Sequence, residues 1–389
     1  MSIYLDNSAT TPICREALDK YNTVSLECFG NPSSLHDMGV LAERELTAAR
    51  RELLSSLGDK QADVIFTASG TEANNLAIFG RALSKQRYLK GSRIITTDGE
   101  HASVHSPLSR LAEMGFEIVK IPTRGGTLDL DALKETLTKN VILVTLMMVN
   151  NETGALYDIA AASRLIHTLS PEALLHVDAT QSYLKLPFTR KSLGADMITV
   201  SSHKIEGPKG VGALVVDAAV KKARGLSPII LGGGQEGAMR SGTENVPGIA
   251  AFGEAIRIGF PLVKERAAAM DKLRSRLIEK INTEPALSEI SITLPESHAP
   301  HILNITLPEI KSETMLHALS ASGIYVSSGS ACSSNSAHSS SALVAFGRTE
   351  AEADCSLRVS LSHRNTPEDI DALCSALADS LTRLVRMKR

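Results

Sequence analysis

The sequence lacks closely paired cysteines, a long apolar run and an excess of charge of either sign. Its cysteines are scattered along 389 residues, and no two of them have CxxC spacing. An odd, dispersed set of this kind argues against a disulfide framework and against a structural zinc site. We therefore expect a protein of a reducing compartment. The five cysteines are Cys14, Cys28, Cys332, Cys355 and Cys374.

The charge balance and the apolar runs exclude two kinds of main partner. With 41 basic and 43 acidic residues the net charge is −2, so neither a nucleic acid nor an anionic membrane surface is the expected partner. The longest apolar run, Val141–Val149, has nine residues including Thr145, too few to span a bilayer. The N-terminal segment MSIYLDNSATTP shows no secretion signal. We expect a cytoplasmic protein.

Short β-branched runs alternate with helical patterns through the first two thirds of the chain. Apolar residues at helical spacing between Ala42 and Leu57 predict a helix that stops at Gly58, and Asp131–Thr138 and Ile159–Thr168 predict two more. This alternation predicts an α/β fold with a mainly parallel sheet between helices. The predicted strands are Val64–Thr67, Arg93–Thr96, Val141–Val149, Leu174–Val177, Met197–Val200 and Gly212–Val216.

The alternation weakens near Gly242–Phe260, where a long helix is expected to begin and to continue through Glu265–Ile278. Two strand-like runs follow, Ile290–Leu294 and Ile302–Leu307, and then two helical stretches. We predict a large domain over residues 15–257. A smaller α+β domain is predicted to combine residues 1–14 with 258–389.

A phosphate site is the first chemical feature that the sequence suggests. SGTEANN follows a predicted strand and opens a helix, so Gly70 and Thr71 would offer free backbone N–H groups and the positive end of the helix dipole. Helix capping by Thr71 explains the segment equally well.

The segment HVDATQS places Asp178 directly after a strand, where open α/β sheets bind ligands. A carboxylate there could keep a pyridine nitrogen protonated, and Gln181 could reach a phenolic oxygen on the same ring. Taken alone, a simple helix cap is the more common explanation of such an aspartate.

In ITVSSHKIEGPKG, Lys204 follows a strand and is flanked by Ser201 and His203. Hydroxyl and imidazole donors beside a lysine suit a Schiff-base lysine next to a phosphate. Lys209, in a glycine-rich turn, is the other candidate for the Schiff-base lysine. The alternative without a function is that both lysines are solvated on a loop.

His101 in GEHAS follows another strand and could stack on a planar cofactor and move protons. His105 is four residues further on, the spacing of two metal ligands on a helix, but no HExxH pattern accompanies the pair. We expect no metal here, and we interpret His105 as a hydrogen-bonded polar residue.

Cys332 and Arg358 are the remaining candidates. Cys332 lies in the serine-rich segment Ser327–Ser341. Such a segment suits a thiol nucleophile that moves between a buried substrate and an acceptor, although most isolated cysteines are inert. Cys355 and Cys374 are expected to be inert. Arg358 in SLRVSL could clamp a substrate carboxylate, or it could form a surface ion pair.

Together and in this order, these features resemble the cysteine desulfurases of the NifS/IscS type, in the class V aminotransferase group of fold type I pyridoxal-phosphate (PLP) enzymes. The resemblance covers nearly the whole chain. Its segments are YLDNSATTP, FGNPSSLH, FTASGTEANNLAI, EHAS, VNNETGALYDI, HVDATQS, SSHKIEGPKGVGAL, GGGQEGAMRSGTEN, SSGSACSS and LRVSL.

The resemblance implies a role for each candidate. Lys204 would hold PLP covalently, Asp178 would pair with the pyridine N–H, and Gln181 would meet the phenolic oxygen, while His101 would stack on the ring. Gly70, Thr71, Ser201 and His203 would hold the phosphate, and Thr243 would reach the phosphate of the neighbouring subunit of a homodimer. Asn151, Arg358 and, more weakly, Asn31 would bind the substrate carboxylate.

The expected reaction removes sulfur from L-cysteine, leaves it as a persulfide on Cys332 and releases alanine, with Lys204 moving the Cα proton and His101 accepting a thiol proton. The acceptor would be an iron–sulfur scaffold or a tRNA-thiolation enzyme. The segment after Cys332 and the short C-terminus, LVRMKR, depart from housekeeping relatives and leave that acceptor open. The alternatives are a selenocysteine lyase, a class V aminotransferase and a non-catalytic sulfur-relay scaffold.

Overall fold

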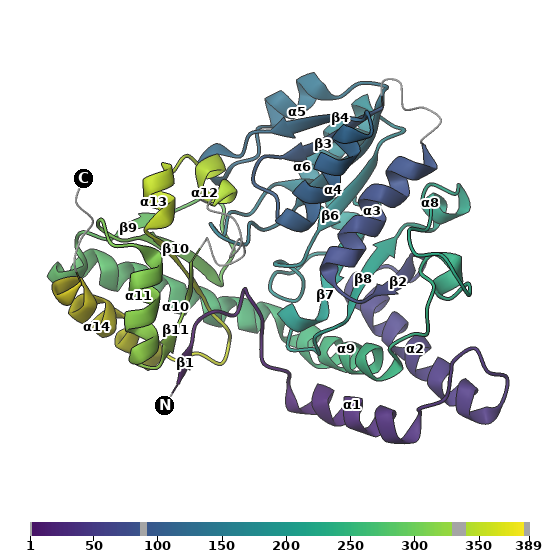
Figure 1. Cartoon of the computed structure of the whole chain (residues 1–389), viewed down its shortest axis with the longest axis horizontal. Helices are drawn as coiled ribbons and strands as arrows, with labels where there is room; N and C mark the ends of the chain where they lie inside the picture. Colours follow the sequence, from purple (N-terminus) through teal and green to yellow (C-terminus); the bar gives the residue numbers. More distant parts are fainter. Residues whose placement is uncertain (1, 86–91, 329–339, 385–389) are drawn as a thin grey trace.

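The computed structural model describes residues 2–85, 92–328 and 340–384 (Figure 1). A large α/β part and a smaller α+β part are joined by the helices α9 (Val246–Gly259) and α10 (Val263–Thr283). The two helices are separated by the short turn Phe260–Leu262, which contains Pro261. The predicted long helix is therefore present but interrupted at this proline.

The large part is built on a seven-stranded sheet of order β2-β8-β7-β6-β5-β3-β4 in the described part of the chain. β3 to β7 pair in parallel, whereas β8 is antiparallel to both of its neighbours, which confirms the mainly parallel sheet. The strands are β2 Asp63–Thr67, β3 Arg93–Thr97, β4 Glu117–Ile121, β5 Val141–Met147, β6 Leu174–Asp178, β7 Met197–Ser201 and β8 Gly212–Val216.

Alternate side chains of these strands belong to two separate hydrophobic cores. Ile65 and Leu214 pack in one core, and Val64 and Val215 pack in the other. Helices therefore cover both faces, as expected for parallel strands that are buried on both sides. The helices of this part are α1 Arg15–Glu27, α2 Asp37–Ser56, α3 Gly70–Ser84, α4 Ala102–Glu113, α5 Leu130–Thr136, α6 Ile159–Leu169, α7 Arg190–Leu193, α8 Ala218–Lys222 and α9.

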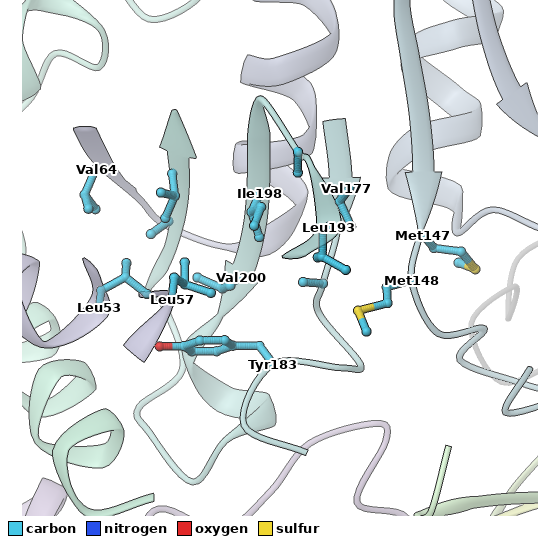
Figure 2. Close-up of a cluster of buried hydrophobic side chains, with 14 of the residues drawn as sticks. Leu53, Leu57, Val64, Met147, Met148, Val177, Tyr183, Leu193, Ile198 and Val200 are labelled. Atoms are coloured by element: carbon cyan, nitrogen blue, oxygen red, sulfur yellow. The ribbon is translucent and has the colours of Figure 1, made fainter. Parts of the chain in front are cut away.

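Figure 2 shows one of these cores, where Leu53 and Leu57 at the end of α2 meet Val64 and Val200 of the sheet. The predicted helix stop is confirmed, because α2 ends at Ser56 and Gly58 takes φ = 65°. The rest of the core includes Val177, Tyr183, Leu193 and Ile198. This packing fixes the strand ends from which the polar residues of the site project.

The smaller part has an antiparallel sheet of order β12-β13-β10-β9 and the parallel pair β1-β11. Its core includes Leu5 together with residues from Met270 to Leu381, so the N-terminal segment returns to the C-terminal part. This grouping supports the predicted domain division, which stays a prediction. The elements are β1 Ile3–Tyr4, β9 Ser291–Thr293, β10 Ile302–Thr306, β11 Ile324–Tyr325, β12 Ser327–Ser328, β13 Ser356–Ser360, α10, α11 Ser312–Ala321, α12 Ser341–Phe346, α13 Glu350–Asp354 and α14 Pro367–Arg383.

Among the described residues, one stretch is long and apolar enough to cross a bilayer, Val246–Thr283. It comprises α9 and α10, and 61% of its most apolar window is buried inside the protein. That burial is typical of a core helix. The predictions from sequence missed the edge strand β4, in which the apolar residues Ile118 and Val119 are only partly buried and lie between exposed charged ones.

Candidate active site

A cavity of about 290 Å³ lies where the large sheet meets the smaller part. Its walls come from the N-terminal segment, from the ends of β5, β6 and β7, from the first turn of α3 and from β13. Open α/β sheets bind ligands at the carboxyl ends of their strands, so this is the expected place for a site. The structure brings ten of the predicted residues together here. They are Gly70, Thr71, His101, Asn151, Asp178, Gln181, Ser201, His203, Lys204 and Arg358.

Asp178 ends β6 and is 6% exposed. Its Oδ2 accepts a 2.8 Å hydrogen bond from Asn74 Nδ2, and its Oδ1 accepts one of 2.9 Å from the Thr180 backbone N–H. These two donors hold the carboxylate in one orientation toward the cavity. Asn74 lies one turn into α3, and the predictions from sequence did not include it.

The same Asn74 amide donates to Ser103 Oγ at 2.8 Å, and Ser103 Oγ lies 2.9 Å from His101 Nδ1. His101 Nδ1 also accepts the Ser103 backbone N–H at 3.1 Å, so Nδ1 is an acceptor and the ring proton belongs on Nε2. Burial lowers the pKa of His101, with Asp178 opposing the shift. A neutral imidazole is thus linked through two side chains to the Asp178 carboxylate.

Lys204 ends the short 3-10 helix Ser202–Lys204 that follows β7. Its Nζ donates to the carbonyl oxygens of Ser8 at 2.6 Å and Ala9 at 2.7 Å. The N-terminal segment therefore reaches across to the lysine, a contact of residues nearly two hundred positions apart that sequence reasoning missed.

Of the predicted phosphate residues, Gly70 and Thr71 begin α3, and Ser201 and His203 line the same cavity. Ser69 caps this helix by accepting the Glu72 N–H at 3.1 Å. A Cβ added to Gly70 would lie 3.3 Å from Ser201 Cβ, which shows how closely the turn approaches Ser201. Burial and, after it, the charge of Lys204 lower the pKa of His203 to about 4. His203 is therefore a neutral hydrogen-bonding group near neutral pH.

Arg358 projects from β13 and is 4% exposed. Its guanidinium donates to the Asn151 carbonyl at 3.0 Å and to Asp6 Oδ1 at 2.9 Å, while its Nε has no partner among the described residues. Asp6 and Asn151 thus hold a buried cation at the cavity wall. A cation held in this way can bind a carboxylate.

Three predicted residues lie elsewhere or outside the described chain. Asn31 is exposed, and its Oδ1 accepts the Ser33 N–H at 2.9 Å in a turn. Thr243 is exposed at the edge of a second cavity of about 240 Å³. Cys332 lies outside the described residues.

The other four cysteines are free thiols. Burial raises the pKa of the Cys14, Cys355 and Cys374 thiols, that of Cys374 to about 11. Because the thiolate is the nucleophile, these three are poor sulfur acceptors. Among the described residues, no group of three or more His, Cys, Asp and Glu side chains is arranged to hold a metal ion.

Comparison with known proteins agrees with this geometry. The sequence profile of the family "Aminotransferase class-V" matches residues 3–373. "Cysteine desulfurase IscS 1" of Archaeoglobus fulgidus is 38% identical over 99% of this chain and 98% of its own. A solved "NIFS-LIKE PROTEIN" superposes with a TM-score of 0.90 at 32% identity, over 99% of this chain and all of that one. The structure "SspA in complex with cysteine" gives a TM-score of 0.80 at 30% identity, over 94% of this chain and all of that one. The chain therefore belongs to the class V aminotransferase family, within its IscS/NifS group of cysteine desulfurases.

Proposed function

We propose that this cysteine desulfurase binds PLP on Lys204, takes sulfur from L-cysteine onto Cys332 and releases L-alanine. The observation that carries the proposal is the convergence of Lys204, Asp178, His101 and Arg358 on one cavity. An amine, an oriented carboxylate, a neutral imidazole and a carboxylate-binding cation are the groups that this chemistry requires.

The donor set of the cavity fits PLP. Gln181 Oε1 and Ser8 Oγ are buried there and have no hydrogen-bond partner in the described part of the chain. A polar ring in the cavity would supply the missing partners, because buried polar atoms are rarely left unpaired. The first turn of α3 offers backbone N–H groups for a phosphate.

Each cofactor contact then has a candidate residue. Bound PLP would supply an electron sink for the carbanion at the substrate Cα. Asp178 would hold the ring nitrogen protonated, His101 would stack on the ring and Gln181 would meet the phenolic oxygen. The phosphate would be held by Gly70, Thr71, Ser201 and His203, with Thr243 from the neighbouring subunit.

The substrate carboxylate would lie against Arg358, whose Nε has no partner among the described residues, with Asn151 beside it. Cysteine in the similar SspA structure supports an amino acid of this size as substrate. Lys204, released by the incoming amine, would move the Cα proton. The neutral His101 can accept the thiol proton, which leaves a thiolate on Cys332.

The chain that carries Cys332 leaves and re-enters the described structure at the cavity. Ser327 is paired with Arg358 in the β12–β13 ladder. At the other end, Ser340 Oγ donates to the carboxylate of Glu152, the residue after Asn151. Cys332 is four residues beyond Ser328, a span of at most about 14 Å for an extended chain. We expect the thiol to reach a substrate held by Arg358.

The thiolate would attack the substrate sulfur, and the C–S bond would break with its electrons left on the alanine carbon. The sulfur stays on Cys332 as a persulfide. We expect transfer from there to an acceptor protein, an iron–sulfur scaffold or a tRNA-thiolation enzyme, in the cytoplasm. A homodimer is part of the proposal, because the exposed Thr243 is assigned to the partner's phosphate.

Two variants test the proposal. The purified protein should carry a yellow, lysine-bound cofactor that Lys204→Ala loses. Cys332→Ala should keep the colour and lose sulfur release from cysteine. Sulfur release that survives in Cys332→Ala would favour another PLP reaction on this scaffold, and a colourless dimer would favour a sulfur-relay scaffold.

A further inference from the structure

A second lysine, Lys185, is buried next to the site and has no part in the proposed reaction. It is 7% exposed, and its Nζ has no hydrogen-bond partner in the described part of the chain. Leu184 before it takes φ = 54°, a left-handed conformation that costs a leucine energy. An unpaired buried amine next to a strained residue is unfavourable for stability and therefore indicates a function.

Lys185 and Lys204 line the same small cavity, which has a volume of about 40 Å³ and is separate from the one assigned to PLP. A polar cavity needs about 10–15 Å³ to hold one water molecule, so this one has room for a bridging water. Its other polar lining residues are Asn7, Thr11, Glu206, Arg266, Ser362 and His363. A proton can therefore pass between the two amines through water in this cavity, without passing through the cavity assigned to PLP.

The charges around Lys185 do not supply it with a counter-ion. Burial and, after it, the charges of Lys204 and Arg358 lower the pKa of Lys185 to about 7, although Glu206 opposes them. The Glu206 carboxylate is already bound to Arg364 at 2.9 Å, with Arg266 at 3.6 Å. Two positive charges so close together in a desolvated cavity repel each other.

The histidines on the neighbouring segments do not compensate the charge of Lys185 either. His301, before β10, is fully buried, and neither ring nitrogen has a partner among the described residues. Burial, then the charges of Lys185 and Arg358, lower the pKa of His301 well below its usual value. Burial and the charges of Lys204, Lys209 and Lys185 lower the pKa of His203 too, and His363 lies 3.9 Å from Glu206. The neighbouring histidines therefore supply no counter-ion for Lys185, and the nearby Glu206 carboxylate is already paired with Arg364.

We propose that Lys185 is a positioning residue for Lys204, and that the two amines share one proton across the cavity between them. A proton leaves the Lys204 ammonium, passes through the bridging water and is taken up by the neutral Lys185 amine. The total charge of the buried site does not change. Lys204 becomes the neutral nucleophile that its reaction with PLP requires, and the proton stays nearby for its return.

This inference rests on the proposed function, because it assigns Lys204 to PLP. It is tested with the PLP-loaded protein and its variants Lys185→Met and Lys185→Gln, which remove the second amine. Lys191→Met removes an exposed lysine from α7 and controls for net charge. The measured quantity is the pH midpoint of the absorption band of the lysine-bound cofactor.

Without a competing amine, the lysine–cofactor link should hold its proton to a higher pH. We expect the midpoint of both Lys185 variants to rise by about one pH unit, and that of Lys191→Met to stay at the wild-type value. The apo form of Lys185→Met should unfold at the same urea concentration as wild type or at a higher one, because an unpaired buried amine is lost.

An unchanged or lower midpoint in both Lys185 variants would overturn the inference and leave the proposed function intact. If Lys185→Met does not fold, Lys185→Gln decides alone. A wild-type protein that forms no lysine-bound cofactor would instead overturn the proposed function itself. The two failures are therefore distinguishable in one experiment.

Discussion

Asn74 Nδ2 lies 2.8 Å from Asp178 Oδ2, so one buried amide on α3 orients the carboxylate that ends β6. The same amide contacts Ser103 and, through it, His101. The residues expected on two sides of the cofactor ring are thereby held by one side chain. Asn74 lines the cavity as well and positions both of them.

Replacement of Asn74 by leucine should therefore weaken PLP binding. A hydrogen bond to a charged group is worth roughly 1.5–3 kcal/mol, so the affinity of the apoprotein for PLP should fall by about tenfold or more. Titration of apoprotein with PLP measures it. Asn75→Leu is the matched control, because in the described part of the chain the Asn75 amide donates to the Thr71 carbonyl, at 2.9 Å, and not to Asp178. Equal affinity in Asn74→Leu and wild type would contradict this role.

Gly212 of β8 passes directly beneath the predicted phosphate turn. A Cβ at this position would lie 2.7 Å from the Gly70 backbone nitrogen, so one of the two backbones must move. Gly212→Ala should lower the free energy of unfolding by roughly 1–3 kcal/mol and also weaken PLP binding. Urea denaturation and PLP titration measure the two effects.

The control for this variant is Gly115→Ala. Gly115 takes φ = 95°, and no described residue comes within 4 Å of the added Cβ, so alanine there is strained but distant from the site. It should reduce stability and leave PLP affinity unchanged. The same pattern in Gly212→Ala would show that Gly212 does not shape the phosphate turn.

His176 is one of the buried histidine rings on which acid stability depends. Its Nδ1 and Nε2 lie 2.8 Å and 2.9 Å from the hydroxyls of Thr145 and Thr199, and burial lowers its pKa to about 4. The native ring stays neutral below the usual histidine pKa of about 6.5, whereas the unfolded ring takes a proton. The stability that depends on the neutral ring is thus complete above about pH 6.5 and is lost as the pH falls toward 4.

In His176→Gln this loss should be absent. Between pH 6.5 and 4.5 the wild-type free energy of unfolding should fall by about 1.4 kcal/mol per pH unit more than that of the variant. Urea denaturation of both apoproteins across this range measures the difference. Parallel pH profiles would show that the native ring titrates like that of an ordinary histidine.

Arg358→Lys tests the carboxylate-binding cation. Lysine keeps the charge but cannot make two parallel hydrogen bonds to a carboxylate. We expect the KM for L-cysteine to rise by about tenfold or more, the value of one charge-assisted hydrogen bond, while the cofactor absorption stays unchanged. Arg348→Lys, which alters an ion pair with Glu352 in the smaller part, is the control. An unchanged KM in Arg358→Lys would place the substrate carboxylate elsewhere.

Much of this site could be predicted from the sequence because its residues directly follow strands. Asp178, Ser201 and Lys204 each lie at or just after a buried β-branched run, and Gly70 opens a helix. The order of strand, turn and helix is visible locally, and the fold brings the strand ends to one edge.

The supporting residues could not be predicted, because their contacts join distant parts of the chain. Asn74 and Asp178 are 104 positions apart, and Lys204 meets Ser8 across 196 positions. Lys185 and His301 are notable only because they are buried without hydrogen-bond partners among the described residues, and burial cannot be seen in the sequence. β4 was missed because charged residues interrupt its partly buried run at the sheet edge.

The most direct test of the account is to locate the transferred sulfur in a single turnover. Reduced, PLP-loaded protein is mixed with one equivalent of L-cysteine, and the peptides and released amino acid are analysed by mass spectrometry. The account predicts one extra sulfur atom on the peptide that contains Cys332, one alanine per sulfur, and neither product in Lys204→Ala. Extra sulfur on Cys14, Cys28, Cys355 or Cys374, or alanine without a persulfide, would contradict it.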